Sequence, residues 1–103
     1  MKKPRNIVGP VVRQCREKAA LTQPMLVAKL NLLGWDISRE TLAKIEAQFR
    51  WVADFELLQL AEALGADAGE ILATAKREMR KGKRRWMPDE SVHRTNVSSS
   101  SGP

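Results

Sequence analysis

Apolar residues recur with the spacing of an α-helix in five segments of this chain, and no segment shows the two-residue alternation of a half-buried strand. Leu, Ala, Glu, Lys and Arg, which suit helices, dominate the composition. We therefore expect an all-α fold of five short helices. The apolar positions that define them are Val11, Val12, Cys15 and Ala19; Leu26, Val27, Leu30 and Leu33; Leu42 and Ile45; Leu57, Leu58, Ala61 and Leu64; and Ile71, Leu72 and Ala75.

Capping residues mark where these helices begin and end. Pro10 fits the first helical position, and Asp67 with Glu70 three residues later forms a capping-box pattern before the fifth helix. Gly34 and Gly65 are placed to end the second and fourth helices. The residues that we expect to cap the second, third and fourth helices at their N-termini are Thr22, Ser38 and Asp54.

The positive charge of the chain lies near its two ends. The 103 residues carry a formal net charge of +6, yet residues 6–75 hold seven bases and nine acids. Residues 76–85 hold seven bases and one acid, and residues 1–5 hold three bases. We divide the chain into a basic N-terminal arm (1–8), a helical domain (9–80) and a basic C-terminal tail (81–103) that we expect to be disordered. Such flanks either add affinity for nucleic-acid phosphates or act only as solubilising tails.

Composition disfavours catalysis and membrane insertion. The single Cys and the single His lie far apart, and the sequence has no Gly-rich phosphate loop and no metal-ligand spacing. We therefore expect no enzymatic activity, no catalytic residue, no metal and no cofactor. No apolar stretch approaches the ~20 residues that span a bilayer, and no secretory signal is evident. A lone cysteine, Cys15, suits a core position in a cytoplasmic protein.

The third helix, at about residues 38–47, carries the candidate chemistry. Leu42 and Ile45 define its buried side, with Arg39 near the edge of the exposed side. A helix in the DNA major groove needs polar side chains near its N-terminus and small residues along its flank. Other surface helices share this property, so it indicates DNA binding only together with a wider pattern. The exposed face is centred on Glu40, Ala43, Lys44 and Ala47.

That wider pattern extends from Val12 to Leu72. It consists of Arg16, Leu21-Thr22-Gln23, Leu26, Leu30, the run Ile37–Glu46, Arg50, Glu56-Leu57-Leu58, the run Leu60–Gly65, and Ile71-Leu72. In this order and spacing, the residues resemble the Cro/cI-type (XRE-like) helix-turn-helix family. The resemblance implies a five-helix, lambda-repressor-like DNA-binding domain with its third helix in the major groove of double-stranded DNA.

The resemblance also implies roles for individual residues. Those expected to face DNA bases are Ser38, Arg39, Glu40 and Lys44, with Arg39 suited to guanine and Glu40 to a cytosine amino group. Those expected to contact phosphate are Gln23, Thr41, Gln48 and Arg50. Arg16 and Glu46 match positions that often form an internal, structural ion pair in this family.

The chain departs from the family pattern in two places. Asn31 stands where a turn glycine is usual, and about five extra residues follow it, so the connection to the third helix is a longer loop. Ala47-Gln48-Phe49 replaces the usual Asn-Gly, so this loop closes without glycine or the helix runs longer. We interpret Trp35 and Trp51 as packing anchors rather than base-stacking platforms.

The function expected from this pattern is a sequence-specific transcriptional regulator, a repressor acting as a homodimer. The alternative is an antitoxin-type module that binds a partner protein, such as a toxin, as well as DNA. An RNA-binding role for the basic tail is a third, weaker interpretation, because few aromatic residues share a face for base stacking. The sequence does not indicate an operator or an effector.

Overall fold

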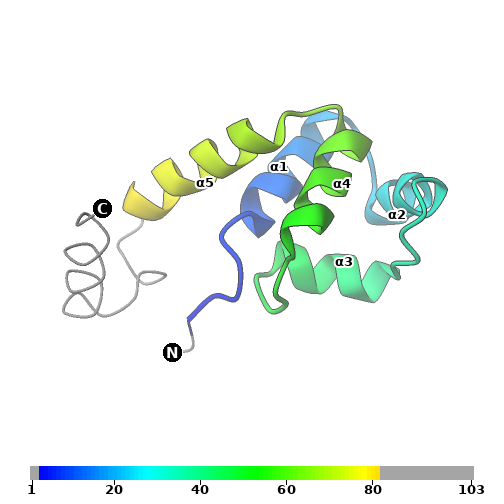
Figure 1. Cartoon of the computed structure of the whole chain (residues 1–103), viewed down its shortest axis with the longest axis horizontal. Coiled ribbons are helices and arrows are strands. Elements are labelled where there is room, and N and C mark those ends of the chain that lie inside the picture. The colour runs from blue at the N-terminus through cyan, green and yellow to red at the C-terminus, as the bar shows by residue number, and fades with distance from the viewer. Residues whose placement is uncertain (1–2, 82–103) are drawn as a thin grey trace, which may run out of the picture.

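The computed structural model describes residues 3–81, which form five helices and no strand (Figure 1). The helices are α1 (Gly9–Lys18), α2 (Gln23–Leu32), α3 (Arg39–Glu46), α4 (Asp54–Leu64) and α5 (Ala68–Lys81). The expected all-α class with five short helices is therefore confirmed. The tail expected over 81–103 lies, apart from Lys81, outside the described residues.

Side-chain caps begin three of the helices as the sequence predicts. Thr22 Oγ1 accepts from the backbone N–H of Met25 at 3.2 Å before α2. An Asp67 carboxylate oxygen accepts from the N–H of Glu70 at 3.0 Å before α5. Ser38 caps α3 in the same manner. The cap predicted at Asp54 is wrong, because the helix begins one residue earlier at an N-cap position occupied by Ala53.

The helices α1 to α4 end in the same type of turn, with one residue in the left-handed region. Two of these residues are the predicted glycines, Gly34 (φ +95°) and Gly65 (φ +66°). The other two are Ala20 (φ 60°) and Gln48 (φ 68°), which adopt this conformation less readily. Paired backbone hydrogen bonds close each turn and satisfy carbonyls that the helix end leaves open.

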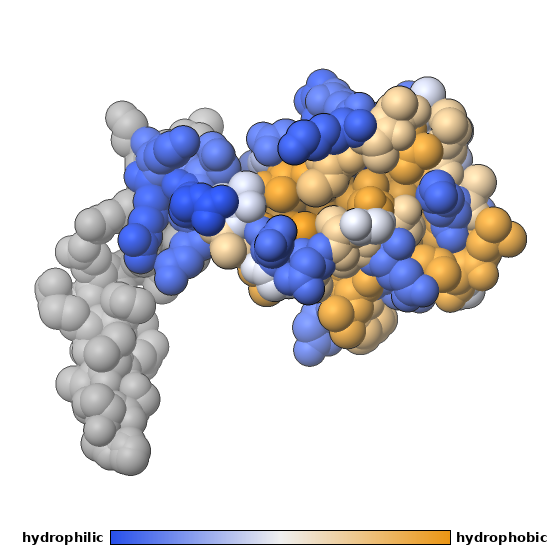
Figure 2. Space-filling view, turned by 90° about the horizontal axis from the view of Figure 1, so that it is seen from above, coloured by the Kyte–Doolittle hydropathy of each residue, from blue (hydrophilic) through white to orange (hydrophobic). Residues whose placement is uncertain are grey.

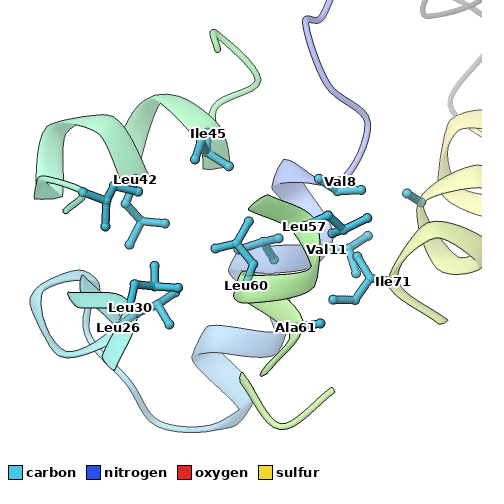
Figure 3. Close-up of a cluster of buried hydrophobic side chains, with 13 residues drawn as sticks. Val8, Val11, Leu26, Leu30, Leu42, Ile45, Leu57, Leu60, Ala61 and Ile71 are labelled. Carbon is cyan, nitrogen blue, oxygen red and sulfur yellow. The ribbon is translucent and has the colours of Figure 1, made fainter. Parts of the chain in front are cut away.

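The core consists of two groups of side chains that meet at Leu60 (Figure 3). In one group, Leu26 and Leu30 of α2 face Leu42 and Ile45 of α3. The other group lies between α1, α4 and α5, and its labelled members are Val8, Val11, Leu57, Ala61 and Ile71. Because α3 packs on both α1 and α2, its position depends on both groups.

Four details of the predicted core are wrong. Leu58 is 62% exposed and Leu72 is 44% exposed, whereas Leu60, which the pattern left out, is completely buried. The buried line of α4 runs through Leu57, Leu60 and Ala61, and Leu58 lies beside it because each helical residue turns by about 100°. Ala19 is also exposed, at the C-cap position that follows α1. Cys15 is half-buried against the core.

The surface of the helical body is mixed, and on the face seen in Figure 2 the densest hydrophilic group lies at the end of α5. Figure 2 shows a dense hydrophilic group beside the residues drawn in grey, and Lys76, Arg77, Arg80 and Lys81 are exposed there. The basic stretch predicted from residue 76 onward therefore begins within a helix. Among the described residues, no helix has the length and apolar character needed to cross a membrane.

Candidate nucleic-acid interface

The helix α3 lies along the lower edge of the molecule in Figure 1, with one side packed and the other open. Leu42 and Ile45 are completely buried, so the predicted buried side is confirmed. Arg39, Glu40 and Lys44 are exposed on the helix. None of the ion pairs found within residues 3–81 includes any of these three side chains. They can therefore contact an external partner without breaking an ion pair of the domain.

The Ser38 hydroxyl caps the N-terminal end of α3 and is bonded to the Thr41 hydroxyl. Ser38 Oγ accepts from the backbone N–H of Thr41 at 3.1 Å and donates to Thr41 Oγ1 at 3.1 Å. Ser38 precedes the first helical residue in an extended conformation, as an N-cap does. The base contact predicted for Ser38 and the phosphate contact predicted for Thr41 would thus come from hydroxyls that already hold the helix end.

The long loop before α3 is held at several points. Asn31 Nδ2 donates to the carbonyl of Trp35 at 2.8 Å and to that of Ile37 at 3.4 Å. The Trp35 ring is half-buried against the core, and the Arg50 guanidinium lies 6.0 Å from its centroid. Gln59 Nε2 donates to the carbonyl of Leu33 from α4. These contacts define the position from which α3 starts.

A buried ion pair holds the C-terminal end of α3. Arg16 Nε donates to Glu46 Oε2 at 2.8 Å and Arg16 Nη2 to Glu46 Oε1 at 3.1 Å. The two side chains are 11% and 4% exposed. The hydrogen bond to Glu46 raises the pKa of Arg16 above its ordinary value. Arg16 Nη1 also donates to the carbonyl of Leu21 at 2.8 Å, so the pair joins α1, α3 and the turn before α2.

The Glu46 carboxylate also accepts a hydrogen bond from Gln23, which the resemblance predicts to contact a phosphate. Gln23 Nε2 donates to Glu46 Oε1 at 3.0 Å, so the side-chain amide is directed toward the ion pair. Gln23 and Arg39 also line an open cleft of about 560 Å³ between the start of α2 and the side of α3. Pro24 has no N–H and the Met25 N–H is bonded to Thr22, so at the start of α2 the Gln23 backbone N–H is the group left for an anion beside α3.

The N-terminal segment (residues 3–8) is bound to the end of α3. Asn6 Nδ2 donates to the carbonyls of Ile45 (3.1 Å) and Arg50 (2.8 Å), and Asn6 Oδ1 accepts from the N–H of Gly9 (2.7 Å). A Cβ atom on Gly9 would lie 2.2 Å from the Ile45 carbonyl oxygen, so only glycine permits this approach. Val8, at the end of the expected arm, is part of the core. The sequence pattern carried no signal for Asn6 or Gly9 in this role.

The loop after α3 employs two further residues that were predicted to contact phosphate. Gln48 Nε2 donates to the carbonyl of Asn6 at 2.9 Å, and the Arg5 N–H donates to the Gln48 carbonyl at 3.0 Å. Arg50 forms two hydrogen bonds with Glu56, at 2.9 and 3.2 Å. These bonds raise the pKa of Arg50 and lower that of Glu56. Both side chains therefore stabilise the loop, which closes without glycine at the left-handed Gln48.

Exposed apolar side chains gather in the chain after α3. Phe49, Trp51, Phe55 and Leu58 are between 62% and 70% exposed. The prediction that Trp51 is a packing anchor is therefore wrong, whereas Trp35 packs against the core as expected. The reason is that Val52, and not Trp51, packs against the core just before α4.

Comparisons with protein-family models, with curated proteins and with solved structures find no significant match to this chain. Within residues 3–81, no group of three or more His, Cys, Asp or Glu side chains is arranged to hold a metal ion. The site is therefore described by its own geometry: an exposed polar helix whose C-terminal end is buried and bonded to three other parts of the chain.

Proposed function

We propose that this chain is a sequence-specific, double-stranded DNA-binding transcriptional regulator of the Cro/cI-type helix-turn-helix class, with α3 in the major groove. The observation that carries the proposal is the exposed face of α3, where Arg39, Glu40 and Lys44 form no ion pair within residues 3–81. The packed side of the same helix holds it rigidly, as base readout requires. The arrangement expected of this class is a lambda-repressor-like one, with α2 crossing the DNA backbone.

Charge supports the same proposal. Arg39 lies in the first turn of α3, from which a guanidinium can bind a guanine by two parallel hydrogen bonds. The start of α2 lies beside this turn across the open cleft, and its Gln23 backbone N–H can donate to a phosphate there. Exposed bases at the end of α5 add sequence-independent attraction to the duplex.

The experiment is selection from a random duplex library with the wild type, Arg39→Ala and Lys29→Ala. Lys29 is an exposed base that lines a hollow formed with Glu62–Gly65, not the cleft beside α3, and serves as the matched control. We expect the wild type and Lys29→Ala to select one sequence, and Arg39→Ala to relax a single base position at a cost of roughly 1–3 kcal/mol. An unchanged preference in Arg39→Ala would contradict the placement of α3 in the groove.

We further propose that the regulator is a repressor that acts as a homodimer on half-sites about one helical turn, ~34 Å, apart. The exposed side chains of Phe49, Trp51, Phe55 and Leu58 support a protein–protein contact next to α3. The same side chains support the alternative, an antitoxin-type module that binds a partner protein. Sedimentation of the protein alone separates the two: a dimer supports the homodimer, and a monomer at high concentration contradicts it and favours the alternative.

A further inference from the structure

Hydrogen bonds hold the N-terminal segment (residues 3–8) to the end of α3 and the loop after it, and each side both donates and accepts. The backbone of Arg5 donates to the Gln48 carbonyl, and the Gln48 side chain donates back to the Asn6 carbonyl. Asn6 Nδ2 then reaches the carbonyl at the end of α3 and that of the following loop. These contacts join residues that are about 40 positions apart in the sequence. The segment therefore moves with α3 and not as a free tail.

The segment also lies on the same side of the molecule as α3. In Figure 1 it runs past the α3–α4 loop and ends below the level of α3. The Lys3 and Arg5 side chains are exposed, and neither takes part in an ion pair within residues 3–81. The body between residues 6 and 75 has more acids than bases, so these two charges are not part of a general basic surface.

We infer that the N-terminal segment is a second DNA-binding element, in which Asn6 and Gln48 hold Lys3 and Arg5 against the backbone phosphates beside the groove that α3 occupies. The inference rests on the proposed function. It assigns Asn6 and Gln48 a positioning role, and it replaces the direct phosphate contact expected of Gln48. A segment that is already ordered loses less conformational entropy on binding than a free basic tail.

The test measures affinity for a mixed-sequence 30-base-pair duplex by fluorescence anisotropy across a series of salt concentrations. We expect the double variant Lys3→Gln, Arg5→Gln to bind more weakly and to lower the slope of log K against log salt by up to about 2, since each phosphate contact contributes about 0.9. The matched control, Lys29→Gln, removes a charge next to Glu62–Gly65, away from this segment, and should keep the wild-type slope.

The positioning role of Asn6 is tested by a double-mutant cycle, which measures the affinity lost with Lys3 and Arg5 in the presence and in the absence of the Asn6 side chain. In an Asn6→Ala background, which retains every charge, removing Lys3 and Arg5 should cost less affinity than in the wild type. Gln48→Gly provides a second background: it removes the side-chain bond to the Asn6 carbonyl, and glycine readily adopts the left-handed φ of 68° at this turn. Urea unfolding of each variant verifies that it is folded under the binding conditions.

The outcomes separate this inference from the proposed function. If the wild type binds no duplex, the proposed function and the inference both fail. If the wild type binds but the double variant keeps its salt slope, the N-terminal segment makes no phosphate contact and only the inference is overturned. Equal losses of affinity with and without Asn6 would overturn the positioning role.

Discussion

The two ends of α3 are held by different kinds of contact. At the N-terminal end, Ser38 and Thr41 form a cap from neighbouring residues, on an exposed surface. At the C-terminal end, Arg16, Gln23 and Asn6 reach the helix from 23 to 39 positions away in the sequence. The difference separates two tasks: the C-terminal end positions the helix, and the N-terminal half presents its side chains.

The energetics of the two ends differ for the same reason. An exposed side-chain cap contributes about 1 kcal/mol, because water replaces the lost hydrogen bond. A buried charge that loses its partner has no such replacement and remains desolvated. Substitutions at the C-terminal end should therefore reduce the stability of the whole domain, whereas substitutions at the N-terminal half should mainly alter what the helix binds.

The largest effect is expected for Glu46→Ala. This change leaves the buried Arg16 guanidinium and the Gln23 amide without their acceptor, and should lower the free energy of unfolding by about 3–5 kcal/mol, measured by urea denaturation. The double variant Arg16→Met, Glu46→Leu removes both charges and should lose less than Glu46→Ala alone. A loss below about 1 kcal/mol in the single variant would show that Arg16 regains water.

A smaller loss is expected for Gly9→Ala, which tests the close approach of α1 to the end of α3. The added Cβ atom meets the Ile45 carbonyl oxygen, a backbone atom that cannot rotate away, so about 1–3 kcal/mol of stability should be lost in thermal or urea unfolding. Gly69→Ala is the control, because its Cβ meets only the Asp67 side chain near the start of α5. Equal effects at the two glycines would contradict the tight contact.

Ser38→Ala tests the other end of the comparison. The loss of the hydroxyl that accepts the Thr41 N–H should lower the free energy of unfolding by about 1 kcal/mol, measured by urea denaturation. The Thr41 hydroxyl also loses its bond to Ser38. Ser38→Asp restores an acceptor at the N-cap and should recover most of the stability. If Ser38→Ala proves as harmful as Glu46→Ala, the two ends of α3 do not differ as described.

The smallest effect concerns the Arg50–Glu56 pair that follows α3, and it depends on pH. Because the folded pKa of Glu56 lies below its ordinary value near 4.5, the pair stabilises the fold above that value and stops doing so as pH falls through the lowered pKa. Wild type and Glu56→Gln should therefore differ by less than about 1 kcal/mol at pH 7 and converge in acid. A difference that grows as pH falls would have the wrong sign. Urea unfolding at several pH values measures it.

Local chemistry was predictable wherever neighbouring residues decide it. The caps at Thr22 and Ser38 and the helix ends at Gly34 and Gly65 follow from residues within the same turn. Burial at Leu42 and Ile45 follows from helical spacing. The spacing is less informative at helix edges, where Leu58 and Leu60 both fit an apolar stripe and only packing against α1, α2 and α5 selects Leu60.

The sequence by itself determined the number of helices, most of their caps, and the polar face of α3 with Arg39, Glu40 and Lys44, because these depend on contacts within a few residues.

Only the tertiary structure decided what the other polar residues do. Gln23, Gln48 and Arg50 have the side chains expected of phosphate ligands, yet each is bonded to a distant or neighbouring group of the fold. Asn6 and Gly9 act on α3 from the N-terminal end of the domain, more than 30 positions away in the sequence. Local spacing does not show which residues become hydrogen-bond partners only after folding. Such partners hold the C-terminal end of α3, and the sequence of that helix does not predict them.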